Sequence, residues 1–352
     1  MTLPVLPTID EELWRYSRIG ELQLDRFAVA EVDTTTTGEV AASAADVPLA
    51  AVSAEVPDVF EQLNAEHARP IIVATRRSEV RDEPVVVTQS VGRSGIVAYP
   101  SLVIDAAENS EVVVIERFVS ADGVASLVVP MVKIRAAQSA RVTYVSINEL
   151  GRDTWMIGYQ RAVGERDSNT SLSTVALGGD YARVRAGVRL VGTGASARQV
   201  ALYLADGSQM HDFRTLQDHA APRTHSDLLF KGAVKDVAKS VYTGLIHIRD
   251  NAAKSEAFQT NRNLTLSHGA WAESVPNLNI ETNDVKCSHA STVGPIDDDQ
   301  RYYLESRGIS PEVAERLVVF GFFADVLDRL PAAAGVAELR RKVSDKLMGV
   351  QA

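Results

Sequence analysis

The middle of the chain consists of short hydrophobic runs separated by small and polar residues. Between Pro70 and about Val293 these runs include VVVIERFV, SLVVPMVKI, RVTYVSI, QVALYL and GLIHI. Short runs rich in valine, isoleucine and threonine, bounded by such breakers, are typical of β-strands. No helical pattern of useful length interrupts them, whereas an alternating α/β fold needs crossovers of about a dozen residues. The pattern therefore predicts a mainly β core over residues 70–293.

A corner of small residues followed by a strand recurs along this core. The corners are centred on Ser110, Ser139, Ser196, Ser240, Ser255 and Gly269. Their spacings are close to multiples of about 14–15 residues, and such a fixed period indicates a β-solenoid in which two units form one turn. Because parallel crossovers are nearly always right-handed, we expect a right-handed parallel β-helix. The alternative is a β-sandwich whose serine-rich turns are evenly spaced by chance.

Both ends of the chain have helical patterns. Residues 1–30 predict a short helical start, with Thr8 and Glu11 at capping-box spacing, followed by a mobile linker over 31–54 and a short helix within 55–68. Beyond Val293, helices are predicted over 297–305, from Pro311 to Pro331 and over 336–348. We therefore divide the chain into an N-terminal helical segment with its linker (1–69), the β-helix core (70–293) and a C-terminal helical region (294–352).

The second of the three C-terminal helices carries a broad apolar face. Its apolar positions recur at helical spacing, at Val313, Leu317, Phe320, Ala324 and Leu327. This face predicts either a cap over the end of the solenoid or a docking surface for a partner protein.

Composition narrows the class of protein. The formal net charge is −10, which disfavours binding to nucleic acid. There is no apolar run long enough for a membrane span and no secretory pattern at the N-terminus, and Cys287 is the single cysteine. Together these features predict a cytoplasmic protein without an internal disulfide.

Several motifs resemble enzyme signatures without matching them. Residues 192–197 (GTGASA) fit a dinucleotide-binding glycine pattern, but a strand pattern follows where that fold needs a helix. There is no Walker A motif, and no nucleophile elbow surrounds any serine. His211, His219 and His225 have spacings that match no familiar zinc site, and their role is left open. We expect a protein that is not an enzyme.

One small constellation has metal-binding chemistry. In the stretch NDVKCSH, Cys287 and His289 would point to the same side of an extended strand, because side chains alternate. A thiolate and an imidazole suit iron, zinc or a cluster edge, and Lys286 would lower the thiol pKa. Two ligands do not complete a cluster site, which takes about four, so a second chain would supply the rest. The alternative is a buried cysteine beside an ordinary polar histidine.

A long segment of the chain resembles the SufB/SufD family. The resemblance covers residues 226–326, through SDLLFKGAVKDVAKSVYTGLIHI, QTNRNLTLS and VPNLNIETNDVKCSHASTVGPIDDDQRYYLESRGIS, and a WRYS element at residues 14–17 is also similar. In place of the family's usual Gly-Ala, Ala290 and Ser291 follow His289, and Asn283 stands where an acidic residue is common. The lack of a second cysteine makes the chain more similar to SufD than to SufB.

The resemblance implies a scaffold for iron–sulfur cluster assembly. It implies a β-helix between helical ends, a complex with a SufB-type paralogue and a SufC-type ABC ATPase that binds the C-terminal helices, and a transient cluster at the scaffold interface. The positions that match the family's ligands are Cys287 and His289, with His289 the stronger candidate. Whether a flavin binds, and whether the isolated chain is a homodimer, stay open. Two alternatives remain: a purely architectural subunit, and a β-solenoid carbohydrate-active enzyme.

Overall fold

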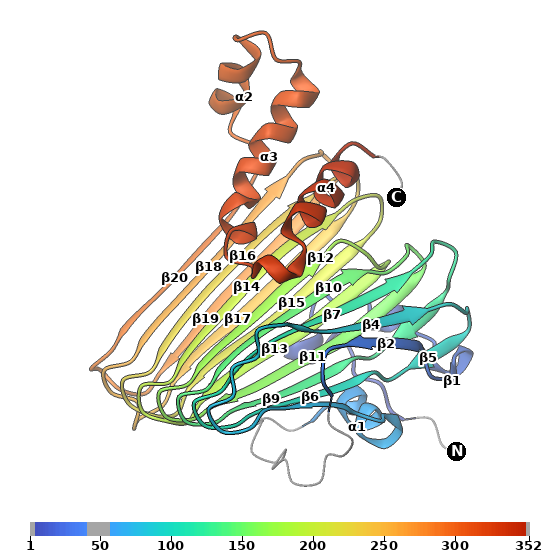
Figure 1. Ribbon diagram of the computed structural model, residues 1–352. Helices are drawn as coiled ribbons and strands as arrows, with labels where there is room; N and C mark the ends of the chain where they lie inside the picture. Colours follow the sequence, from blue (N-terminus) through green and yellow to red (C-terminus); the bar gives the residue numbers. More distant parts are fainter. Residues whose placement is uncertain (1–3, 41–56, 350–352) are drawn as a thin grey trace.

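The computed structural model describes residues 4–40 and 57–349. Its strands form two long sheets that face each other and advance along the molecule as a β-solenoid (Figure 1). Among the described strands, every pair is parallel except β2 with β4. The mainly β solenoid predicted from the short hydrophobic runs is therefore confirmed.

From β10 onward each turn of the solenoid contributes one strand to each sheet, and in the two turns before it the first-sheet strand is divided in two (β5 and β6, β8 and β9). The first sheet contains β1 (Ala28–Val29), β3 (Ile71–Ala74), β5 (Ile96–Ala98), β6 (Ser101–Ala106), β8 (Ser126–Val128), β9 (Met131–Ala136), β11 (Thr154–Gly164), β13 (Tyr181–Leu190), β15 (Met210–His219), β17 (Lys239–Ile248) and β19 (Trp271–Ile280). The second contains β2 (Asp33–Thr37), β4 (Val85–Val91), β7 (Glu111–Ser120), β10 (Arg141–Glu149), β12 (Asn169–Ala176), β14 (Ser196–Ala205), β16 (His225–Val234), β18 (Glu256–Thr265) and β20 (Lys286–Gly294).

The corners explain the sequence period. Two residues before each of the strands β7, β10, β12, β14, β16 and β18 of the second sheet, one residue adopts a positive φ angle, and these residues are Asn109, Ser139, Asp167, Gly194, Arg223 and Lys254. Asn109, Asp167 and Gly194 belong to the residue types that tolerate this left-handed conformation best, whereas Ser139, Arg223 and Lys254 adopt it at the same place in the turn. Residues 192–197 form one such corner and lead into strand β14.

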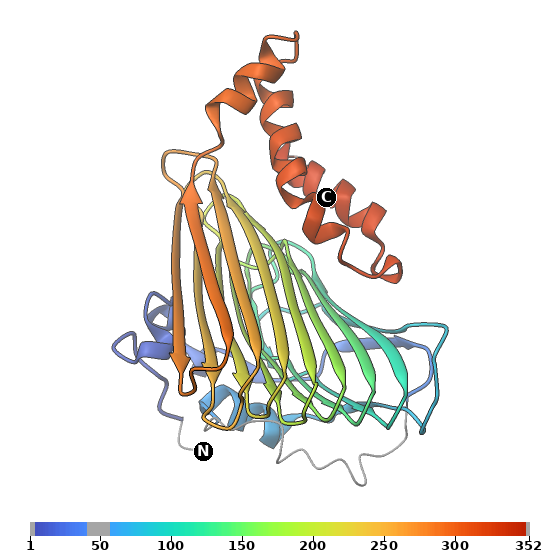
Figure 2. The same cartoon turned by 90° about the vertical axis from the view of Figure 1, so that its left-hand side faces the viewer.

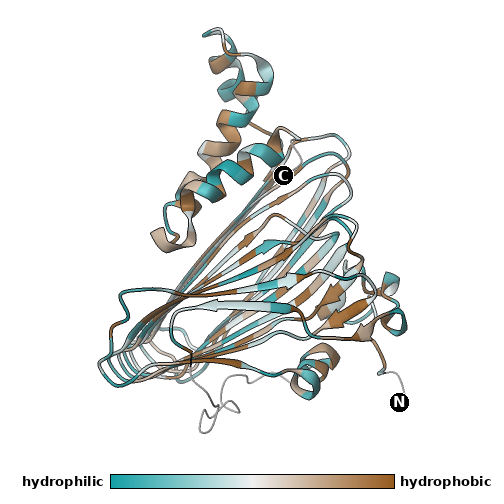
Figure 3. Cartoon of the chain, turned by 45° about the vertical axis from the view of Figure 1, so that its right-hand side comes forward, coloured by the Kyte–Doolittle hydropathy of each residue, from teal (hydrophilic) through white to brown (hydrophobic). Residues whose placement is uncertain are grey.

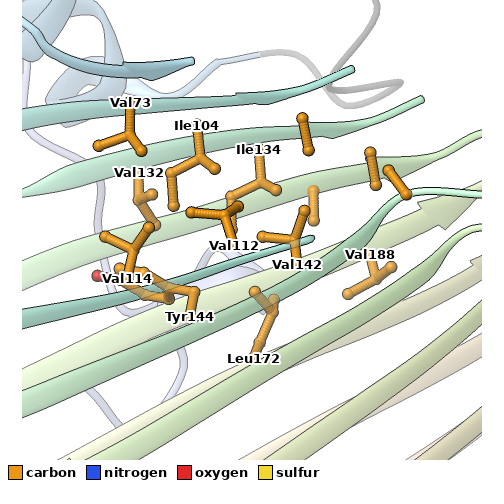
Figure 4. Close-up of a cluster of buried hydrophobic side chains, with 14 of the residues drawn as sticks. Val73, Ile104, Val112, Val114, Val132, Ile134, Val142, Tyr144, Leu172 and Val188 are labelled. Atoms are coloured by element: carbon orange, nitrogen blue, oxygen red, sulfur yellow. The ribbon is translucent and has the colours of Figure 1, made fainter. Parts of the chain in front are cut away.

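Alternating side chains fill the lumen between the sheets. In β4 every second residue is buried, and in the register of the second sheet Val112 lies opposite Val142. Close to the first turns these inward positions form a continuous aliphatic core (Figure 4). Burial of such stacked valines and isoleucines stabilises the coil, because each turn covers the apolar side chains of its neighbours.

The N-terminal segment differs from its prediction. Instead of one helix, residues 12–26 form three short 3-10 turns (Glu12–Trp14, Ile19–Glu21 and Leu24–Arg26). The proposed N-cap Thr8 does not cap a helix, although its N–H donates to the Glu11 carboxylate at 3.0 Å. Trp14 is buried against the Arg183 guanidinium, 4.1 Å from its ring centre, and tertiary docking onto the first sheet thus overrides the local helical pattern.

The prediction of a linker over residues 31–54 is also partly wrong. Strand β2 falls inside residues 31–54 and pairs antiparallel with β4, while residues 41–54 lie outside the described residues. The helix expected within 55–68 is present as α1 (Val59–His67), capped by the Asp58 carboxylate. It lies on the outer face of the first sheet, where the Asn64 amide donates to the Pro100 and Val129 carbonyls.

The C-terminal region contains α2 (Asp298–Glu305), α3 (Pro311–Leu327) and α4 (Val336–Leu347). Helices α3 and α4 pack on the outer face of the second sheet, whereas α2 projects beyond the strands (Figure 2). None of the described helices combines the length and apolar character needed to cross a lipid bilayer.

The apolar face of α3 is rotated from the predicted stripe. Its buried residues are Ala314, Val319, Phe323, Val326 and Leu327, and Leu317 is exposed. They contact outward side chains of the second sheet such as Val200 and Leu202, so the helices cover the flank of the solenoid and do not cap its end (Figure 3). This placement of the helices was not predicted. It depends on the apolar outer face of the second sheet, which is formed by residues of several strands.

Candidate functional site

Cys287 and His289 lie on β20, the last strand of the second sheet. In the register with β18, Cys287 is opposite Ala257 and His289 is opposite Gln259. Ala257 and Gln259 are buried lumen residues, and side chains on neighbouring parallel strands point to the same side. Cys287 and His289 therefore both face the lumen.

The lumen is open at this last turn. Strands β19 and β20 are the final members of their sheets, each paired on one side only among the described strands. Their inward side chains Leu278, Ile280 and Val293 are 39%, 41% and 42% exposed, although the equivalent positions further inside are buried. His289 is exposed and Cys287 is half-buried, so both are accessible from the open end.

The thiol of Cys287 packs beside apolar neighbours. It contacts a cluster that contains Ile246, Ile248 and Ala257, and burial raises the pKa of the thiol. The prediction that Lys286 lowers this pKa is wrong, because Lys286 points to the opposite side and pairs with Glu256 at 2.7 Å. The thiol is therefore protonated at neutral pH in the free chain, and a metal ion would have to displace that proton.

The chain supplies an incomplete set of metal ligands. Across residues 4–40 and 57–349 there is no group of three or more histidine, cysteine, aspartate or glutamate side chains arranged to hold a metal ion. A soft thiolate and an imidazole at one open end fit iron or a cluster edge chemically, and they leave further coordination positions for ligands from outside the chain.

The other candidate histidines do not form a metal site. His211 is buried with its Nε2 3.2 Å from the Gly178 carbonyl, and burial lowers its pKa to about 3. His219 is held between the Thr224 and Ser226 hydroxyls at 2.7 Å each, and burial lowers its pKa to about 4. His225 is exposed beside Glu256. The first two are therefore neutral parts of the lumen, held by hydrogen bonds within the chain.

Asp218 and Asp227, which neighbour His219 and His225 in the sequence, also have separate partners. The Asp218 carboxylate accepts hydrogen bonds from the Arg249 guanidinium at 2.8 and 3.0 Å, and Asp227 pairs with Arg329 at 3.1 Å. Neither carboxylate orients a histidine against a serine, so the arrangement required for nucleophilic catalysis is not made by these residues.

A polar column beside the candidate ligands was not predicted. The Ser291 hydroxyl donates to Ser274, which donates to the Asn261 amide oxygen, each at 2.7 Å. Asn261 in turn donates to the Tyr203 hydroxyl at 3.0 Å. The alternation of side chains together with a repeat of about 30 residues would have placed these residues in one lumen, because paired strands stack in register.

Comparison with known proteins identifies the family. Residues 87–322 match the family model described as "SUF system FeS cluster assembly, SufBD core domain". The chain belongs to the SufBD family. It is 38% identical over 281 residues to an iron-sulfur cluster assembly SufBD family protein of Mycobacterium bovis, covering 78% of this chain and 69% of that protein.

The relatives of this SufBD chain include proteins named SufD. The SufD protein of Escherichia coli K12 is 28% identical over 297 residues, covering 83% of this chain and 70% of the relative. The SufD protein of Bacillus subtilis is 31% identical over 232 residues, covering 65% of this chain and 53% of the relative. The resemblance found in the sequence is thereby confirmed, and the family's role in iron–sulfur cluster assembly argues against a carbohydrate-active enzyme.

Proposed function

We propose that this SufBD chain is a scaffold subunit that contributes Cys287 and His289 to iron or a nascent iron–sulfur cluster shared with a second scaffold chain. The observation that carries the proposal is the open last turn, where two soft donors face an accessible lumen. The cluster is the cargo of this site, and a SufB-type paralogue supplies the remaining ligands. The chain works in the cytoplasm and has no catalytic residues of its own.

The edges of the last turn suit a second solenoid. An unpaired strand edge presents N–H and C=O groups that can extend a sheet into a partner. Here two such edges, β19 and β20, flank exposed Leu278, Ile280 and Val293. A paralogue with the same fold could pair with both edges and cover these side chains, which would bring its own ligands to His289.

The C-terminal helices suit the SufC-type ATPase. Beside α2 and α3 lies a groove of about 1110 Å³ whose lining includes Tyr303, Leu317 and Phe322. Tyr302, Tyr303 and Leu317 are 72%, 57% and 45% exposed, so these helices offer apolar contact area to a partner. We assign this face to the ATPase.

Ion pairs connect these helices to the solenoid and would transmit movement. The Lys231 ammonium on β16 pairs with Asp325 of α3 at 2.7 Å, and the Lys346 ammonium of α4 pairs with Asp206 at 2.9 Å. The Lys346 side chain is only 12% exposed, and desolvation lowers its pKa. Separating such a buried pair is costly, so the helices and the strands would move together when the ATPase changes state.

The test uses the reconstituted complex with its paralogue and ATPase. His289→Ala should abolish or strongly reduce cluster formation, followed by visible absorbance, and Cys287→Ala should reduce it. Ser288→Ala is the matched control, because Ser288 lies between them on β20 with its side chain on the opposite side. Unchanged assembly in His289→Ala would remove His289 as a ligand.

A purely architectural role is the second candidate. Iron binding by the complex after removal of both Cys287 and His289 would favour that role. Pairing through the last turn is tested separately by Leu278→Glu with Val293→Glu, which should prevent association with the paralogue. Val191→Glu, at an equally exposed position (39%) on another turn, should leave association intact.

A further inference from the structure

Gln259 lies directly below His289 in the lumen. The two residues are register partners on β18 and β20, and neighbouring strands are separated by about 4.8 Å. Gln259 is 2% exposed, so its side chain belongs to the interior, while His289 stands at the open end.

The amide of Gln259 is unusual among the buried groups of this region. Neither its oxygen nor its nitrogen has a hydrogen-bond partner among the described residues. A buried amide without partners costs free energy, and such groups are uncommon in folded proteins.

The neighbours of Gln259 do not satisfy the amide. On one side Ala257 belongs to an apolar cluster, and on the other side the Asn261 amide is already bonded to Ser274, Asn263 and Tyr203. The facing strand leaves room for the amide at Gly244, where an added Cβ would lie 2.5 Å from the Gln259 nitrogen. The fold thus makes space for this amide one strand below the candidate ligand.

We propose that Gln259 is a positioning residue for His289. When His289 binds a metal ion through one ring nitrogen, the Gln259 amide oxygen accepts the N–H of the other. The inference rests on the proposed ligand role of His289 and adds the group that orients it.

The chemistry of histidine ligands supports this assignment. A histidine that binds a metal through one nitrogen nearly always donates its other N–H to an oxygen, and this fixes the tautomer and the orientation of the ring. An amide oxygen does this without adding charge to a site that already contains a thiolate. Loss of such a partner typically lowers metal affinity about 10–100-fold.

Gln199 provides a matched control in the same column. The register connects Gln199 to Leu228, and Leu228 to Gln259, so Gln199 lies two strands further inside. It is equally buried at 2%, and its amide oxygen also lacks a partner among the described residues. Replacing Gln199 removes the same group from the same lumen without reaching His289.

The experiment uses the full chain labelled with ¹⁵N-histidine and Zn²⁺ alone, in millimolar excess, as the probe. Long-range ¹H–¹⁵N spectra report which ring nitrogen carries the proton, and His289 is assigned by its loss in His289→Ala. In the wild type, Zn²⁺ should produce a single His289 tautomer. Gln259→Met should bind Zn²⁺ at least about tenfold more weakly and show mixed tautomers. Gln259→Glu, which keeps an acceptor, should restore the single tautomer, and Gln199→Met should match the wild type.

The outcomes separate the inference from the proposed function. Mixed tautomers or no Zn²⁺ response in the wild type would overturn the role of Gln259, and so would wild-type behaviour of Gln259→Met. None of these results depends on the variants being active. The ligand role of His289 is tested separately, by the assembly assay with His289→Ala. The positioning role of Gln259 can therefore be refuted while the ligand role of His289 is retained. If His289 is not a ligand, both roles are refuted.

Discussion

The buried carboxyl group of Glu116 gives the solenoid a specific pH dependence. Glu116 is 2% exposed in the lumen, where its carboxyl group accepts a hydrogen bond from the Tyr144 hydroxyl at 2.7 Å and a weaker one from the Gln89 amide at 3.5 Å. No cation of the described chain pairs with it at salt-bridge distance. Burial raises the pKa of Glu116 to about 7, because the lumen disfavours the charged form.

Proton binding by Glu116 makes the free energy of unfolding depend on pH. Between the ordinary glutamate pKa of 4.5 and about 7, the folded chain holds a proton that the unfolded chain has released. The contribution of Glu116 to the free energy of unfolding therefore falls as pH rises through this window and levels off above it. A pKa shift of this size corresponds to a change of roughly 3 kcal/mol in the free energy of unfolding.

Glu116→Gln isolates this contribution. Glutamine keeps an acceptor for the Tyr144 hydroxyl and cannot ionise, so the variant should gain stability relative to the wild type at pH 8 and little at pH 4.5. Urea unfolding of both proteins at several pH values measures the difference. A difference that does not change between these pH values would refute the assignment of a neutral carboxyl group in the lumen.

Three further predictions concern the flank and the open end. Phe323→Ala, which empties a fully buried position between α3 and the second sheet, should lower the free energy of unfolding by about 3–5 kcal/mol in a denaturant titration, whereas Tyr302→Ala on exposed α2 should have little effect. Gly244→Ala should destabilise the chain by thermal unfolding, because its Cβ would lie 2.3 Å from the Tyr242 hydroxyl oxygen, and wild-type stability would show that the lumen can relax there. Alkylation of Cys287 at pH 7 should be slower than that of a model thiol and should accelerate with increasing pH, since burial raises the thiol pKa; a rate faster than the model thiol would contradict this.

Much of the solenoid could be predicted because its turns repeat locally. The strand-and-corner period follows from residues that tolerate a positive φ angle, such as Asn109 and Gly194, and paired positions of the second sheet such as Glu111, Arg141 and Asn169 recur close to the predicted repeat. Alternation along one strand was likewise enough to put Cys287 and His289 on the same side.

The predictions that were wrong depend on contacts between segments that are distant in the sequence. The N-terminal residues form 3-10 turns because Trp14 docks on Arg183, far away in the sequence. The sequence did not show that α3 lies along the second sheet, since this depends on outward residues of several turns. The thiol pKa was predicted in the wrong direction because Lys286 was considered as a neighbour in sequence, whereas the desolvating apolar neighbours come from other strands. Gln259 was missed for the same reason.

The ligand role proposed for His289 at the open last turn can be measured on the cluster itself. The direct measurement is pulsed electron–nuclear spectroscopy of the reduced, cluster-loaded complex, in which only this chain carries ¹⁵N-histidine and the paralogue is unlabelled. If His289 binds the cluster, its directly bound nitrogen should give a strong ¹⁵N coupling, which disappears in His289→Ala and persists in Ser288→Ala. A wild-type complex that holds the cluster without any such coupling would contradict it.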